Sequence, residues 1–103
     1  MEMTRNEYKN ILLKNRFLFV KTQKGFPGRG DEDVYIHPKY KYNFYVTKVR
    51  KGEDCRYGFY TGERNGELLD HIVSRNVSDN FRKDKALRLW EGKAFIKLID
   101  LFK

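Results

Sequence analysis

Cysteine, histidine and proline are scarce in this chain. Its 103 residues include one cysteine, Cys55, two histidines, His37 and His71, and two prolines. A single cysteine cannot form a disulfide within one chain, which favours a reducing compartment, and we interpret Cys55 as a small core residue. One cysteine and two histidines cannot supply a four-ligand zinc site. We therefore expect no metal centre, and nothing in the sequence predicts a bound cofactor.

Long apolar runs and targeting signals are also missing. No apolar run approaches the roughly 20 residues that a membrane-spanning helix requires. The N-terminus has no basic region followed by an apolar stretch, which a secretory signal would have. We expect a cytoplasmic protein with no membrane partner. A glycine-rich phosphate loop is not predicted either, because Gly25, Gly28 and Gly30 lack the Lys-Ser/Thr ending of such a loop.

The residues that are present suit one folded domain. Hydrophobic residues make up 40% of the chain, and eight Phe, seven Tyr and one Trp supply large apolar side chains. A disordered segment of similar charge would lack these side chains. The sequence contains no internal repeat or linker, so residues 1–103 are predicted to form a single domain around one core.

Local patterns predict a helix followed by a strand and a loop. Thr4 and Glu7 have capping-box spacing before a helical repeat of apolar residues, which predicts a helix over about residues 5–15 with Lys9, Lys14 and Arg5 in water. The consecutive apolar residues of 17–21 suit a buried strand. Glycine, proline and charge over 22–33 indicate an exposed, mobile loop in which Asp31, Glu32 and Asp33 are solvated.

Further strands and helices are expected after this loop. Residues 34–37 suit a short strand, and alternation over 40–50 and 55–61 predicts an antiparallel hairpin. Helical spacing predicts a short helix over 67–75. A final helix is expected to be capped by Ser78 or Asp79, to include Trp90 and to bend or divide at Gly92. The fold class is therefore α+β, with a small antiparallel sheet of three to four strands and with the N-terminal helix and C-terminal helices packed on one face.

The charge of the chain is its clearest functional signal. Twenty-two Lys and Arg against 14 Asp and Glu leave a net charge of +8, which favours phosphate backbones or other acidic partners. Residues 39–51 contain five basic side chains, four aromatic ones and no acid. Basic side chains neutralise phosphates and aromatic ones stack on bases. The predicted nucleic-acid-binding residues are Lys39, Lys41, Asn43, Tyr45, Lys48, Arg50, Lys51 and Arg56, with a second cluster at Arg82, Lys83, Lys85 and Arg88.

The preferred interpretation is a non-enzymatic module that lays its basic hairpin against DNA or RNA. The leading alternative is a small inhibitor, encoded by a phage or mobile element, that docks on a nucleic-acid-processing protein of the host through residues 25–33 or the aromatic hairpin. A third is cleavage of RNA with His37 as general acid–base. The residues 39–51 are also compatible with the simple solvated face of a sheet, in which the aromatic residues are core.

Overall fold

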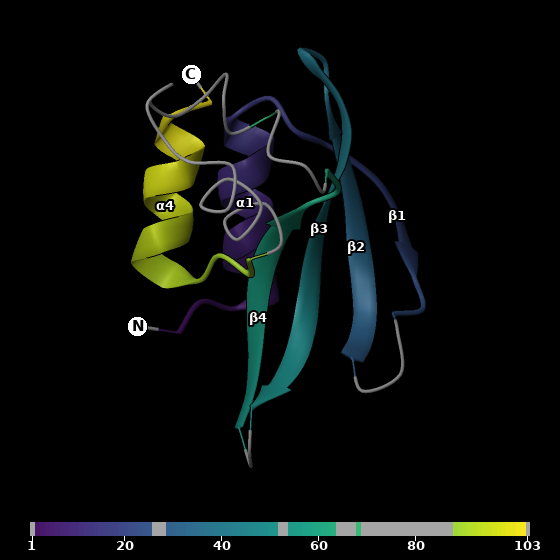
Figure 1. Ribbon diagram of the computed structural model, residues 1–103, viewed down its shortest axis with the longest axis vertical. Helices are drawn as coiled ribbons and strands as arrows, with labels where there is room; N and C mark the ends of the chain where they lie inside the picture. Colours follow the sequence, from purple (N-terminus) through teal and green to yellow (C-terminus); the bar gives the residue numbers. More distant parts are fainter. Residues whose placement is uncertain (1, 26–28, 52–53, 64–67, 69–87, 103) are drawn as a thin grey trace.

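The computed structural model describes residues 2–25, 29–51, 54–63, 68 and 88–102, and places two helices beside a four-stranded sheet (Figure 1). Neither helix, nor any other helical stretch in these ranges, is long and apolar enough to cross a bilayer. In chain order the elements are α1 (Arg5–Lys14), β1 (Leu18–Gln23), β2 (Arg29–His37), β3 (Tyr40–Lys51), β4 (Asp54–Thr61) and α4 (Gly92–Asp100).

The sheet is antiparallel throughout and its strands follow one another in chain order, β1-β2-β3-β4. The predicted hairpin is confirmed, because β3 and β4 pair continuously from Phe44 opposite Thr61 to Lys51 opposite Asp54. The predicted α+β class and the upper strand number of four are confirmed as well.

Helix α1 begins and ends where the sequence indicates. The Thr4 hydroxyl accepts a hydrogen bond from the backbone N–H of Glu7, and the Glu7 carboxylate accepts one from the backbone N–H of Thr4. This reciprocal pair satisfies two backbone donors that the first turn would otherwise leave open. The predicted capping box is thus confirmed.

Side chains from both helices and from three strands form one aromatic-rich core. Tyr8 of α1 lies 4.7 Å from Phe95 of α4 between ring centroids, and Phe95 lies 5.1 Å from Phe59 of β4. Phe59 in turn stacks on Phe44 of β3. Figure 1 shows both helices on the same side of the sheet. The remaining buried residues of this core are Met3, Leu12, Phe17, Tyr35, Val46, Leu68, Leu98, Ile99 and Phe102.

Two predictions for the first strands are wrong. Leu18, Phe19 and Val20 of β1 are 54%, 41% and 49% exposed, although Phe17 just before them is buried. The reason is that β1 is the edge strand of the sheet. The predicted mobile loop is also wrong over residues 29–33, which form the first part of β2, while residues 26–28 lie outside the described chain. The glycine and acid content of this segment predicted a loop, but Glu32 and Asp33 form hydrogen bonds inside the protein.

Two predictions for the later part of the chain are wrong. Trp90 is not helical: its backbone N–H and carbonyl bond to Phe59, so it adds a bridge beside β4. Helix α4 instead begins at Gly92, whose φ of 51° lies in the left-handed region that favours glycine. Cys55, predicted to be core, is exposed. The predicted helix over 67–75 and the predicted start of the final helix fall, apart from Leu68, outside the described residues.

The segment before α4 makes a close contact with β4 that gives a testable prediction. A Cβ atom on Gly58 would lie only 2.4 Å from Cγ of Leu89. We expect Gly58→Ala to lower the free energy of unfolding by about 1–3 kcal/mol, because the side chain has to move in a packed contact. Urea unfolding measures this loss. The double variant Gly58→Ala, Leu89→Ala should lose less stability than the sum of the losses of the two single variants. A loss equal to that sum would contradict the contact.

Candidate nucleic-acid interface

The predicted binding residues on β3 are divided between the two faces of the sheet. Side chains alternate along a strand, so Lys41, Asn43 and Tyr45 point away from the face that carries the core residue Phe44. Lys48 and Arg50 have the parity of Phe44 and project from the helix-bearing face. At about 3.3 Å per residue, Lys41 and Arg50 also lie about 30 Å apart along the strand. The structure therefore does not bring the whole set together.

The cations near the β3–β4 turn have neighbours within the fold. The Nζ atom of Lys48 lies 5.8 Å from the ring centroid of Tyr57, its partner across the strands. Arg56, opposite Val49, approaches the Glu2 carboxylate at 3.4 Å. Arg50 is exposed but also interacts within the protein. The Glu2 carboxylate offsets part of the charge of Arg56. The ring contact leaves the charge of Lys48 in place, and Lys39 and Lys41 make equivalent contacts with Tyr40 and Tyr42, each at 5.8 Å.

A second group of cations lies at the opposite end of the sheet. Arg16 sits in the connection from α1 to β1, Lys39 in the turn from β2 to β3, and Lys41 at the start of β3; we call these three residues the turn-end cluster. Figure 1 shows both connections at the same end of the sheet. All three side chains are exposed, and none forms an ion pair with a described residue.

Arg16 and Lys39 both lie near enough to His37 to lower its pKa. The pKa of His37 lies below its usual range, first because the ring is buried and second because the charge of Arg16 disfavours a second positive charge. Lys39 acts in the same direction. Two residues more than 20 positions apart in the chain therefore both lie near the His37 ring.

Arg16 occupies a backbone position that usually holds glycine. The N–H of Phe17 bonds to the carbonyl of Leu12 at 3.1 Å, and the N–H of Arg16 to that of Leu13 at 3.4 Å. These bonds form a Schellman motif at the end of α1, with Arg16 at the residue after the cap and a φ of 73°. A side chain in this region costs about 1 kcal/mol relative to glycine.

Asn43 and Tyr45 continue from Lys41 along the same strand face. Asn43 is exposed, whereas Tyr45 is half-buried and stacks on Tyr60 of β4 with 4.7 Å between ring centroids. The Tyr60 hydroxyl donates a hydrogen bond to Glu32. One face of the Tyr45 ring is thus used inside the sheet, so Tyr45 contributes less aromatic surface to a ligand than the sequence pattern predicts.

The second predicted cluster is only partly described. Arg82, Lys83 and Lys85 lie outside the described residues, and the side chain of Lys51 is not described either. Arg88 is exposed, and its guanidinium carbon lies 4.9 Å from the centroid of the Trp90 ring. Trp90 borders β4, the strand at the far edge of the sheet from β1. Arg88 is thus near β4 rather than in the turn-end cluster.

His37 has the surroundings of a structural residue. It is 5% exposed, and its ring lies 4.8 Å from that of Phe17 and 5.2 Å from that of Tyr40 between centroids. Its Nδ1 atom accepts a hydrogen bond from the backbone N–H of Lys39 at 3.1 Å. A general base needs a free nitrogen within reach of substrate. This geometry supports the β2–β3 turn and not the cleavage of RNA.

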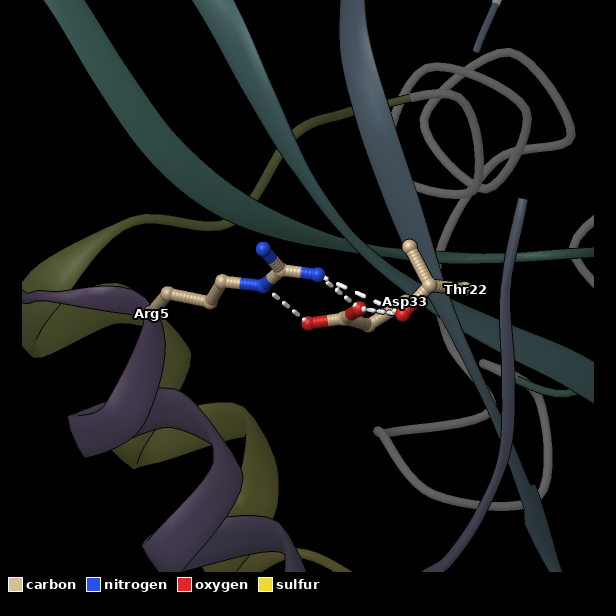
Figure 2. A network of polar contacts seen from close by, with 3 residues as sticks. All are labelled: Arg5, Thr22 and Asp33. Carbon is tan, nitrogen blue, oxygen red and sulfur yellow. Dashed lines mark hydrogen bonds and ion pairs between the residues drawn. The ribbon is translucent and has the colours of Figure 1, made fainter. Parts of the chain in front are cut away.

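The acids of β2 are engaged in the fold, contrary to the prediction of solvated charge for Glu32 and Asp33. Arg5 donates two hydrogen bonds to the Asp33 carboxylate, one of them at 2.6 Å from Nε, and Thr22 donates a third at 2.7 Å (Figure 2). Burial opposes ionisation of Asp33, but these bonds hold its pKa below the usual range. Asp31 is exposed, as predicted. Among the described residues, no cluster of acids, His or Cys is arranged to hold a metal ion.

Arg16 is the residue of this interface that sequence reasoning missed. A single cation between a helix and a strand forms no cluster in the sequence. Its left-handed conformation cannot be recognised from the sequence either, because the residue is not glycine. The division of β3 between two faces, by contrast, follows from the parity of its residues.

Comparisons with known proteins add no family to this geometry. No protein-family model, no curated protein and no solved structure matches the chain.

Proposed function

We propose that the protein is a non-enzymatic module that binds the phosphate backbone of a nucleic acid through the turn-end cluster. The observation that carries the proposal is that three exposed cations, Arg16, Lys39 and Lys41, lie at one end of the sheet without an ion pair to any described residue. Exposed lysine and arginine side chains bind phosphates and release the condensed counterions. The net charge of +8 adds long-range attraction to any polyanion.

The proposal differs from the sequence prediction in the residues it uses. Lys39, Lys41 and Asn43 remain, Arg16 is added, and Tyr45 lies at the margin. Lys48, Arg50 and Arg56 belong to the other end of the hairpin and are not needed for the same backbone contact. Asn43 offers an amide that can donate to a phosphate or sugar oxygen. This set contacts backbone only, so we expect little base preference.

The backbone conformation of Arg16 supports a functional use of its side chain. Glycine would be the less strained residue at this position, and an arginine there lowers the stability of the fold. Residues that conflict with local preference are expected at functional sites. If Arg16 were only a solvated surface residue, its replacement by glycine would raise the stability of the fold at no cost to function.

We therefore expect Arg16→Gly to act in opposite directions on stability and on binding. It should raise the free energy of unfolding by about 1 kcal/mol, because the left-handed conformation is no longer strained. It should also weaken binding to a fluorescein-labelled oligonucleotide several-fold, because one phosphate contact is lost. Urea unfolding and fluorescence anisotropy measure the two effects on the same preparation.

Arg16→Lys is the matched control, since it keeps both the positive charge and the strained conformation. It should leave stability unchanged and binding within about twofold of the native protein. If Arg16→Gly gains stability and binds as tightly as the native protein, the cluster is only a solvated surface and the proposal is refuted.

A further inference from the structure

Strand β1 lies at the edge of the sheet in the described part of the chain and exposes three large apolar side chains. It pairs with β2 on one side, and no described backbone group outside the sheet bonds to it on the other. Of the large hydrophobic side chains that are exposed, Leu18, Phe19 and Val20 belong to β1, and Ile36 lies beside Leu18 in the register. Natural sheets usually protect an edge strand with charge, proline or a bulge, because unpaired backbone groups recruit another strand. Strand β1 has one lysine and one bulge beside its three exposed apolar residues.

The charge around this edge is positive on both faces. On the face of α1, Nζ of Lys9 lies 4.9 Å from the centroid of the Phe19 ring. Lys21 is exposed on the opposite face, which also carries Leu18. The two residues share this face because the bulge between Phe19 and Lys21 places Lys21 opposite Val34 and Leu18 is opposite Ile36. Strand β1 contains no acid, and the carboxylates of Glu32 and Asp33 next to it are buried and hydrogen-bonded within the fold. Each face of the edge thus combines apolar surface with a lysine, half-buried Lys9 on one face and exposed Lys21 on the other.

We propose that the edge of β1 binds an extended, acidic segment of a partner protein as a fifth strand of the sheet. Backbone hydrogen bonds along the edge supply affinity, and the side chains on either face select the sequence. Apolar residues of the segment cover Leu18, Phe19 and Ile36, while its carboxylates meet Lys9 and Lys21. This surface begins two residues after Arg16, but it uses neither the side chains of the turn-end cluster nor residues 25–33, where the sequence alone placed a protein contact.

Charge decides between such a partner and a second copy of this chain. Two copies paired through β1 would bring Lys9 and Lys21 of each close to those of the other, and two net charges of +8 together. Like charges across an interface oppose association. An acidic segment converts the same charges into attraction.

The test uses a labelled peptide of about eight residues in which valine and glutamate alternate, long enough for one ordinary strand. Anisotropy should report binding, and a peptide with lysine in place of glutamate should bind at least about tenfold more weakly. Methylating every second backbone nitrogen removes the donors of one edge of the peptide. Methylation of either the odd-numbered or the even-numbered nitrogens should abolish binding, and methylation of the other set should preserve it, because only one edge of the peptide faces β1.

Protein variants locate the peptide. Leu18→Thr with Val20→Thr keeps a high strand preference and removes apolar surface, and should weaken peptide binding at least about tenfold. Ile96→Thr, at an exposed apolar residue of α4, is the matched control and should leave it unchanged. The native protein, the Leu18→Thr, Val20→Thr variant and the Ile96→Thr control should bind an oligonucleotide equally. A failure of peptide binding can then be distinguished from a failure of nucleic-acid binding.

Three results would overturn the inference. The first is that the acidic peptide does not bind, and the second is that the two methylated peptides bind equally well. The third is that the native protein forms dimers that the Leu18→Thr, Val20→Thr variant does not form. The last result would assign the edge to a second copy of the chain.

Discussion

Replacing Arg5 with methionine is expected to lower the free energy of unfolding by about 2 kcal/mol near neutral pH. The Asp33 side chain is only 5% exposed and receives two hydrogen bonds from Arg5. Without Arg5, a buried carboxylate keeps one donor, Thr22 (Figure 2). Loss of a partner from a fully buried ion pair costs about 3–5 kcal/mol, and we discount this because Arg5 itself is 43% exposed.

The same substitution should reverse the contribution of Asp33 to the pH dependence of stability. In the native protein the pKa of Asp33 is lowered, so its contribution to stability is complete above about pH 4, the unfolded value, and is lost as pH falls through the lower folded value. In the variant we expect burial, the largest influence on Asp33, to outweigh the remaining bond from Thr22 and to raise the pKa of Asp33. Its ionisation then opposes folding, so stability is greatest below about pH 4 and falls as pH rises through the raised folded value.

Urea unfolding from acid to neutral pH checks both effects. Lys9→Met is the matched control: Lys9 lies on the same helix and also lowers the pKa of Asp33, but only through space. It should change the free energy of unfolding by less than about 0.5 kcal/mol and keep the native pH dependence. Equal losses in the two variants would show that the hydrogen bonds of Arg5 carry no special weight.

The second large effect concerns binding. Lys39→Gln with Lys41→Gln should weaken the affinity for an oligonucleotide about tenfold at low salt, because two exposed cations of the turn-end cluster are lost. The slope of log K against log salt concentration should become less negative by about 1.4–1.8, which corresponds to two phosphate contacts. Both values come from anisotropy titrations over a series of salt concentrations.

Charge-matched controls separate a site from general attraction. Lys24→Gln with Lys93→Gln removes the same charge from exposed positions at the other end of the molecule, after β1 and at the start of α4 (Figure 1). This pair should change affinity by less than about twofold. Lys48→Gln with Arg50→Gln tests the turn of the hairpin in the same way. If all three pairs weaken binding equally, net charge and not the cluster determines affinity.

The parts of the fold that the sequence predicted are those with strong local signals. Thr4 and Glu7 define the start of α1 because a capping box needs only neighbouring residues. The alternation from Tyr40 to Val46 predicted β3, since Phe44 and Val46 are core while Lys41 and Asn43 are exposed. Lys39, Lys41 and Asn43 of the candidate site follow from the same alternation.

The parts that could not be predicted depend on contacts between distant residues. Nothing near Asp33 in the sequence shows that Arg5, 28 positions earlier, compensates its burial, so the segment resembled an exposed loop. Consecutive apolar residues in β1 suited a central strand, and only the sheet order shows that the strand lies at an edge. Arg16 and Lys39 lie at the same end of the sheet because the end of α1 and the β2–β3 turn lie there.

The most direct measurement is the salt dependence of binding by the native protein to single- and double-stranded DNA and RNA oligonucleotides, followed by fluorescence anisotropy. Three phosphate contacts, from Arg16, Lys39 and Lys41, predict a slope of about −2 to −3 in a plot of log K against log salt concentration. Affinities that are independent of salt, or no binding to any of the four nucleic acids at low salt, would contradict the proposal that this protein is a nucleic-acid-binding module.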